Sequence, residues 1–243
     1  MQRGKINGLL MKWFVKLLGN KDDLEDLSKV CNSPELIIRK EEDYFILESK
    51  DFEKLENHTD VYHKACEIVV LINGATTIAL RNKEPLRIEN VIKVDDEGRK
   101  NFYSFSSVNI TLPRIRCNLT IKSQNGKNVE FNEAAPVPYW YQVAQKEKKV
   151  AEVLSLLAEN DLYWEKLYIL YEEVLGDVKS AIDKKGWVTK KDIKRFTQTA
   201  QQYRHGESGL KSWKPPKHPM TFEEGKSFVL HIIEIWLKYK CTK

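Results

Sequence analysis

Arg204 and His205 stand side by side in the chain, and their side chains could together act on a phosphodiester. A guanidinium grips phosphate through two parallel hydrogen bonds. An imidazole accepts and donates protons near neutral pH. We therefore take both residues as candidate catalytic groups.

Residues 184–217, which include this pair, form the most basic part of the chain. They hold ten lysines and arginines against two acidic residues, a net charge of +8. On a helix predicted to follow Thr189, cations four positions apart form adjoining rows. Farther along, Trp213 stands among lysines, which is typical of a surface that binds single-stranded nucleic acid. The candidate nucleic-acid-binding residues are Lys190, Lys191, Lys194, Arg195, Lys211, Trp213, Lys214 and Lys217.

The rest of the chain carries its charge differently. Residues 1–140 hold 21 Lys and Arg and 21 Asp and Glu, whereas residues 141–243 hold 19 and 14, which accounts for the whole net charge of +5. This asymmetry indicates that a polyanionic partner would meet the second half.

Metal and cofactor chemistry finds little support in the sequence. His63 and Glu67 are four apart on a predicted helix, but two ligands do not make a zinc site, and a surface pair explains them. The acidic clusters 41–43 and 95–97 fall at predicted turns, where Asp side chains satisfy turn amides. We therefore expect no metal and no cofactor.

Several common enzyme classes lack their local signatures here. There is no Gly-rich phosphate loop, nucleophile elbow or Cys–His dyad signature. The four cysteines are far apart and fit reduced thiols in a cytoplasmic protein. No apolar run reaches the roughly 20 residues that a membrane-spanning helix needs, and the apolar segment 8–19 does not read as a signal peptide.

The first half, residues 1–135, is predicted to be an antiparallel sheet with one or two helices. Residues 35–49 form two apolar runs around an acidic turn, and residues 114–131 alternate like a strand. Residues 60–75 have helical spacing, with Asp60 as the predicted N-cap and Asn73-Gly74 as the predicted end. Residues 12–19 fit either a strand or a short helix.

The second half, residues 136–243, is predicted to be a bundle of four helices, so that the whole chain belongs to the α+β class. A proline-containing break at 132–140 separates the halves. The predicted helices lie within residues 139–160, 161–183, 190–203 and 222–240. Asp161, Thr189 and Thr221 are the predicted caps of the last three.

The second half also resembles a known family. The stretches "YWEKLYILYEEV", "FTQTAQQYRHG" and "PMTFEEGKSFVLHIIEIWLKY" are similar in pattern to the HEPN superfamily, over roughly residues 140–240. The resemblance implies a helical bundle that often dimerises and occurs in bacterial defence and toxin–antitoxin systems. Many members are metal-independent ribonucleases whose Arg precedes a His with four to six residues between them. Here Arg204 is adjacent to His205, which favours the non-catalytic members.

Three functions therefore remain open. The first is a non-catalytic protein, expected as a homodimer and away from membranes, that binds nucleic acid or nucleotides through its second half and a protein partner through its first. The second is a metal-independent endoribonuclease or toxin that uses Arg204 and His205. The third is a structural interaction protein whose basic segment is only a solvated surface.

Overall fold

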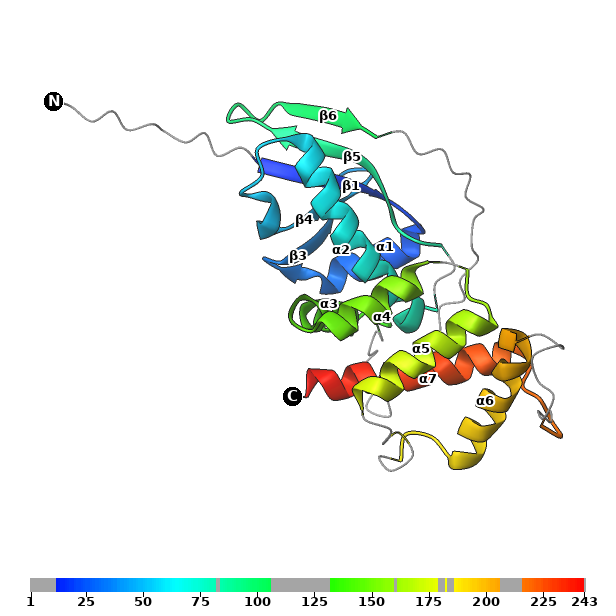
Figure 1. Ribbon diagram of the computed structural model, residues 1–243. Helices are drawn as coiled ribbons and strands as arrows, with labels where there is room; N and C mark the ends of the chain where they lie inside the picture. Colours follow the sequence, from blue (N-terminus) through cyan, green and yellow to red (C-terminus); the bar gives the residue numbers. More distant parts are fainter. Residues whose placement is uncertain are drawn as a thin grey trace, which may run out of the picture. The chain divides into compact units, whose positions relative to one another are not determined.

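The chain has an α+β fold, as predicted, with an antiparallel sheet in its N-terminal part and helices throughout the remainder (Figure 1). The contacts divide it into two compact units, Met1–Ile72 with Glu84–Pro138 and Asn73–Lys83 with Tyr139–Lys243. This division differs from a single boundary between residues 135 and 136, because Asn73–Lys83 pack with the later residues. The computed structural model describes residues 12–81, 84–105, 132–159, 161–178, 182, 186–205 and 216–242, without the side chains of Arg204 and His205.

The first unit is built on a six-stranded sheet in the order β2-β3-β4-β1-β5-β6, with every neighbouring pair antiparallel. Its strands are β1 (Lys12–Leu18), β2 (Asn32–Ser33), β3 (Leu36–Lys40), β4 (Phe45–Glu48), β5 (Arg87–Val94) and β6 (Lys100–Ser104). Helix α1 (Lys21–Val30) and the short helix η1 (Lys50–Phe52) connect some of them. The predicted strand at 114–131 lies outside the described residues.

Hairpins form around both predicted acidic turns. β3 pairs with β4 across residues 41–44, and β5 pairs with β6 across residues 95–99. In the second turn one carboxylate oxygen of Asp95 accepts hydrogen bonds from the amides of Glu97 and Arg99, at 3.0 and 2.9 Å. Gly98 has a φ of 79°, which only glycine adopts readily. These contacts confirm that the acidic residues 95–97 serve a turn.

Strand alternation gives the sheet two different faces. On the first, which we call the Val15 face, Val15 pairs with Leu47 and Val91, and all three are fully buried. On the second, the Phe14 face, Phe14 lies opposite Ile92, and Ile46 packs with both. The alternation of successive side chains in a strand puts these sets on opposite sides.

Helix α2 (His58–Ala79) covers the Val15 face. Its first turns are joined to β6 and to the residue after it by stacked rings: His58 lies on Tyr103 with centroids 4.3 Å apart, and Tyr62 lies on Phe105 at 3.9 Å. Rings four residues apart on the helix thus stack on rings two residues apart in the extended chain. Segment 12–19, which fitted two structures by sequence, is the central strand β1.

Both predicted ends of α2 are wrong. Asn57 takes the capping position: its carboxamide oxygen accepts from the amide of Asp60 at 2.9 Å, while Asp60 accepts from the Asn57 side chain. The helix also runs through Gly74 to Ala79. A Cβ built on Gly74 would lie 2.0 Å from the carbonyl oxygen of Leu154, so this glycine permits a close helix contact and does not end the helix.

The second unit is helical apart from its connections. Its helices are α3 (Val137–Lys146), α4 (Lys148–Ala158), α5 (Trp164–Asp177), α6 (Lys190–His205) and α7 (Phe222–Cys241), together with the end of α2. α5 packs against α4, α6 and α7. Residues 139–160 were predicted as one helix but form two, because Glu147 has an extended backbone (φ −117°, ψ 103°). The N-cap of α5 is Tyr163, not Asp161, and it has no side-chain cap.

A buried ion cluster explains why the helix breaks at Glu147. The ammonium of Lys240 is nearly buried and binds the carboxylates of Glu147 and Asp177, the latter at 3.0 Å. Asp177 also accepts from the indole of Trp236 at 2.9 Å. The start of α4 and the ends of α5 and α7 therefore meet at the ammonium of Lys240. This tertiary contact fixes Glu147 in a way that no local signal encodes.

Candidate nucleic-acid interface

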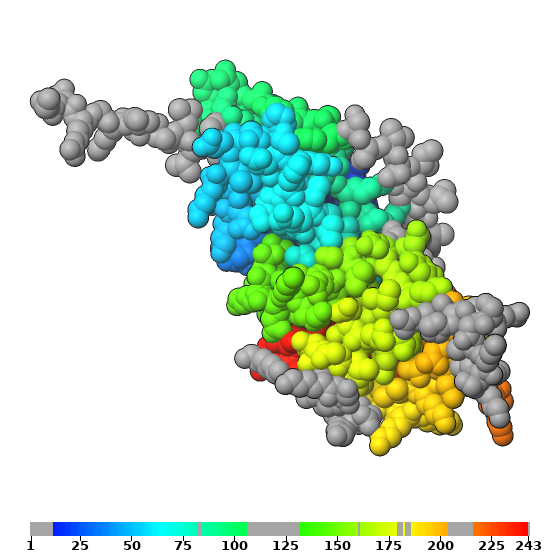
Figure 2. Space-filling view, in the orientation of Figure 1, coloured from blue at the N-terminus to red at the C-terminus, as the bar shows by residue number. Residues whose placement is uncertain are grey.

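Helix α6 has one buried and one polar side. Phe196, Thr199 and Ala200 are fully buried, at helical spacing. Lys190, Lys191 and Lys194 are exposed on the opposite side, which continues through the glutamines 198, 201 and 202. We call this side the polar face of α6. In the space-filling view the surfaces of α5 (yellow-green) and α6 (yellow to orange) are contiguous (Figure 2).

The cap at the start of α6 engages the acidic residue that lies among its lysines. Thr189 caps the helix, as predicted: its hydroxyl accepts from the amide of Asp192 at 3.1 Å and donates to the Asp192 carboxylate at 2.6 Å. Asp192 is thereby engaged with the cap. Within the part of the chain that the structure describes, neither Lys191 nor Lys194 has an ion-pair partner. Their charge is therefore available to an external anion.

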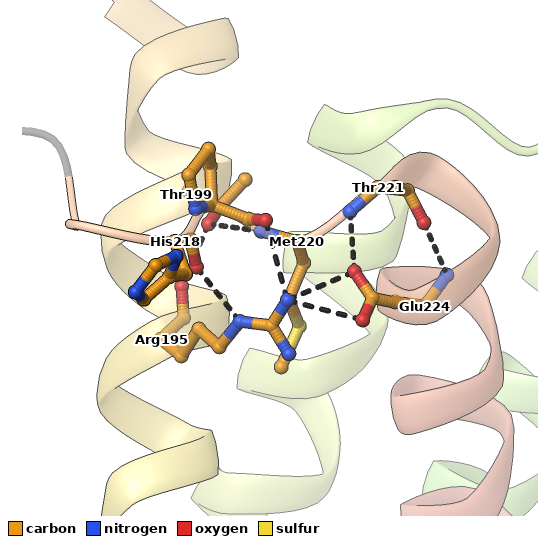
Figure 3. A network of polar contacts seen from close by, with 7 residues as sticks. Arg195, Thr199, His218, Met220, Thr221 and Glu224 are labelled. Carbon is orange, nitrogen blue, oxygen red and sulfur yellow. Dashed lines mark hydrogen bonds and ion pairs between the residues drawn. The ribbon is translucent and has the colours of Figure 1, made fainter.

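Arg195, a predicted nucleic-acid-binding residue, is engaged inside the molecule (Figure 3). Its guanidinium donates to the carbonyl oxygens of His218 and Pro219, at 2.8 and 3.3 Å. It also binds both carboxylate oxygens of Glu224, at 3.0 and 2.9 Å. Arg195 thus ties α6 to the segment that leads into α7. We call this set of contacts the Arg195 clamp.

Glu224 belongs at once to the clamp and to the cap of α7. Thr221 and Glu224 form the predicted capping box, in which Glu224 accepts from the Thr221 amide at 2.7 Å. This hydrogen bond, together with that from Arg195, holds the pKa of Glu224 below its ordinary value. The carboxylate is therefore charged wherever the clamp is formed.

A second set of contacts, made by Thr199, holds the segment before α7 against α6. The hydroxyl of Thr199, which is fully buried, accepts from the amide of Met220 at 3.0 Å and donates to the carbonyl of Arg195 at 2.8 Å. Residues 218–221 are thus held along α6 by a guanidinium, a hydroxyl and a carboxylate. Figure 3 shows these groups converging between the two helices.

An exposed aromatic stack lies at the other end of α6. Tyr203 stacks on Trp164 of α5, with ring centroids 5.1 Å apart and planes 5° from parallel. Trp164 is 7% exposed and packs on Gly225 and Phe222, whereas Tyr203 is 50% exposed. Tyr203 is not among the site residues predicted from the sequence. Its position seven residues after Phe196, on the apolar stripe, was the available signal.

The remaining predicted site residues divide into three groups. Lys217 is exposed in the segment held by the Arg195 clamp. Arg204 and His205 are the last two residues of α6, and their side chains lie outside the described part of the structure. Lys211, Trp213 and Lys214 lie outside the described residues altogether. The structure therefore brings Lys190, Lys191 and Lys194 together and assigns Arg195 a separate contact.

Two further features are absent from the described ranges. No three metal-ligating side chains gather there into a possible metal site. Glu67, which the sequence paired with His63, instead binds Lys64 at 2.8 Å. Among the same residues no helix combines the length and the apolar character needed to cross a membrane.

Comparison with known proteins gives no relative: no family model, no curated protein and no solved structure matches this chain.

Proposed function

We propose that the second unit is a HEPN-like helical bundle that binds single-stranded nucleic acid along the polar face of α6. One observation carries this proposal: three exposed lysines crowd the first turns of one helix, and Lys191 and Lys194 have no acidic partner within the described residues. Like charges at this spacing do not stabilise a helix. An external polyanion gives them a role, because each lysine that meets a phosphate releases a condensed counterion.

The aromatic stack lies on the apolar stripe of α6, away from the lysines, and offers a second kind of contact to a bound strand. Single-strand binding proteins combine a cationic track with aromatic rings on which bases stack. Tyr203 offers a half-exposed ring whose other side rests on Trp164, so its orientation is fixed before a base arrives. Stacking of this kind tolerates any base, and we expect binding to depend little on sequence.

A salt titration of single-stranded RNA and DNA binding tests the proposal. With three phosphate contacts, the logarithm of the affinity should fall against the logarithm of salt concentration with a slope of about −2. Fluorescence anisotropy with labelled oligonucleotides measures this. Undetectable binding at about 50 mM salt, where such contacts are strongest, would contradict the proposal.

Two triple variants with the same change of net charge separate a local site from overall charge. In the first, Lys190, Lys191 and Lys194 become Gln. In the second, three surface lysines of the first unit become Gln, each of which already binds a carboxylate: Lys40, Lys50 and Lys64. We expect the first to weaken binding about tenfold or more and the second to have little effect. Equal weakening by both would mean that no interface exists on α6.

A metal-independent endoribonuclease is the second candidate, favoured by the register of α6. Position 205 follows position 194 by eleven residues, about three turns, and so falls on the same side of the helix as the lysines. An acid–base group at that position would be in line with bound phosphates. RNA cleavage in the presence of EDTA, compared with His205→Ala, tests this activity. Absent cleavage, or cleavage that the substitution leaves unchanged, excludes it.

A further inference from the structure

The Phe14 face of the sheet holds a cavity of about 170 Å³. Its floor is made by Phe14, Ile46 and Ile92, which are 7%, 2% and 2% exposed, and Tyr44 and Val94 pack against them. These residues come from β1, β4 and β5 and from the turn before β4. An apolar hollow is thus built into a sheet face that also carries many charges.

Cationic side chains lie over this apolar floor. The ammonium of Lys12 lies 5.1 Å from the centre of the Phe14 ring, and that of Lys16 lies 5.0 Å from the Tyr44 ring. Arg39 also faces Phe14, at 5.6 Å. Such contacts attract cations to the ring faces. The cavity therefore combines aromatic walls with neighbouring cations, of which Lys12 and Lys16 also pair with carboxylates.

The rim of the cavity has an unequal number of charges. Arg39, Glu41 and Lys100 line it, and together they carry one excess positive charge. Arg39 is fully engaged, because it binds the carboxylates of both Glu41 and Glu48. Partial burial works against ionisation of Glu41, but Arg39 and Lys100 outweigh it and lower its pKa. Because Arg39 also binds Glu48, Glu41 is an anion that Arg39 and Lys100 share.

Lys100 is the more loosely held cation of the rim. Its ammonium lies 3.4 Å from a Glu41 carboxylate oxygen and 3.2 Å from the Tyr44 hydroxyl, at the long end of hydrogen-bonding distance. Its side chain is 44% exposed. An ammonium has three donors, so Lys100 can receive another anion without breaking the contact to Tyr44.

We propose that this cavity binds a small apolar carboxylate, such as a single-ring aromatic acid, with its ring on Phe14 and Ile92 and its carboxylate on Lys100. The size supports one ring, since an engineered apolar cavity of about 150 Å³ takes up benzene. The charge supports an acid, because the loosely held ammonium of Lys100 lies at the rim. This site is separate from the α6 interface and does not depend on nucleic-acid binding.

Three probes with the same ring but different charges test whether the ligand must be an anion. They are benzoate, benzyl alcohol and benzylamine. Titration of the full chain, followed by protein NMR shifts or by calorimetry, gives their affinities. For about nine heavy atoms we expect benzoate to bind at about 1 mM, more tightly than benzyl alcohol, while benzylamine binds weakest. No benzoate binding up to about 10 mM, or equal binding of benzoate and benzylamine, would overturn the proposal.

Two lysines on adjacent strands give a matched pair of variants. Lys100→Gln removes the proposed anchor and should weaken benzoate binding about fivefold while leaving benzyl alcohol unchanged. Lys93→Gln is the control, because Lys93 lies over Trp13 on the Val15 face. Equal effects of both substitutions on benzoate would overturn the proposal.

A third variant tests the cavity itself. Val94→Phe fills the space beside Ile92 and should abolish binding of all three probes, with a thermal unfolding midpoint close to that of the wild type as evidence of folding. Should this variant not fold, Val94→Leu serves the same purpose and should weaken benzyl alcohol and benzoate by the same factor. Undiminished binding in a folded filling variant would mean that the probes bind elsewhere.

Discussion

The Phe14 face of the sheet and the polar face of α6 both present several cations, but they dispose of the charge in opposite ways. On the sheet, Lys12 binds Glu48, Lys16 binds Glu89, and Arg39 bridges two carboxylates. On α6, Lys191 and Lys194 have no such partner among the described residues. The sheet face pairs most of its cations internally, with Lys100 held only by a long contact to Glu41, whereas Lys191 and Lys194 keep their charge for an external partner.

This difference shows what the pairing does for each surface. Exposed ion pairs each contribute about 0–1 kcal/mol, so the pairs on the sheet add little stability. Their main effect is to cancel the field over that unit, whose sequence region is close to neutral. Lys191 and Lys194, which have no ion-pair partner among the described residues, leave a field that can attract a polyanion from a distance. Local pairing, more than the number of lysines, separates the two surfaces.

The second unit also contains a nearly buried cation, Lys240, and removing its charge should have the largest effect on the free energy of unfolding. Lys240 is 9% exposed and holds Glu147 and Asp177. Lys240→Gln leaves two carboxylates facing each other in a partly buried place, and we expect a loss of about 3 kcal/mol of unfolding free energy. Urea denaturation measures it.

Lys238→Gln is the matched control for that change. Lys238 lies two residues earlier on α7, is 62% exposed and pairs with Glu234. Its removal should cost less than about 0.5 kcal/mol. Comparable losses from both substitutions would show that burial does not divide the cations of this unit as described.

Arg195 tests whether a cation on α6 can belong to the paired class. Arg195→Gln removes hydrogen bonds to two backbone carbonyls and should lower the unfolding free energy by about 1 kcal/mol. Because the clamp already occupies its guanidinium, oligonucleotide affinity should change less than twofold. A tenfold loss of affinity with unchanged stability would return Arg195 to the binding surface and reverse its assignment.

A smaller effect is expected when the polar face of α6 is given the internal pairing that the sheet has. Gln198 follows Lys194 by four residues, so Gln198→Glu creates an acidic partner on the same side. We expect oligonucleotide affinity to fall about threefold at low salt, and the loss to vanish as salt screens it. Gln198→Ala is the control for the side chain, and an equal loss with it would exclude pairing as the cause.

The smallest effect concerns acid stability at the Arg195 clamp. The pKa of Glu224 lies below its ordinary value of 4.5, because the Thr221 amide and then Arg195 bind its carboxylate. A lowered folded-state pKa stabilises the protein above the unfolded pKa, and this contribution is lost as the pH falls through the folded value. Wild type should therefore lose slightly more stability below pH 4.5 than Glu224→Gln does. Parallel acid curves for the two proteins would show that the clamp does not depend on this charge.

The elements that could be predicted from the sequence are those whose causes lie within a few residues. The hairpin turn at Asp95 and the capping box of Thr221 and Glu224 each satisfy backbone amides locally. The exposed lysines at the start of α6 follow from helical spacing around a buried Phe196. In these cases the pattern and the interaction occupy the same stretch of chain.

The features that were missed have their causes elsewhere in the chain. Asn73-Gly74 resembles a helix end, but packing on Leu154 keeps it helical. Arg195 resembles a phosphate ligand, but its carbonyl and carboxylate partners are 23 to 29 positions away. The Tyr203 stack likewise depends on Trp164 of another helix. Composition and spacing carry no information about such partners.

The shared helix α2 has a consequence for how the chain acquires its structure during synthesis. Its first fifteen residues belong to one compact unit and its last seven to the other. The surface around Gly74 leaves the ribosome well before Leu154, which must cover it. The first unit can therefore close while the end of its own helix is still without a partner. At that stage the surface around Gly74 is exposed. The helix that contains Leu154 in a second nascent chain could then cover it in place of the chain's own helix.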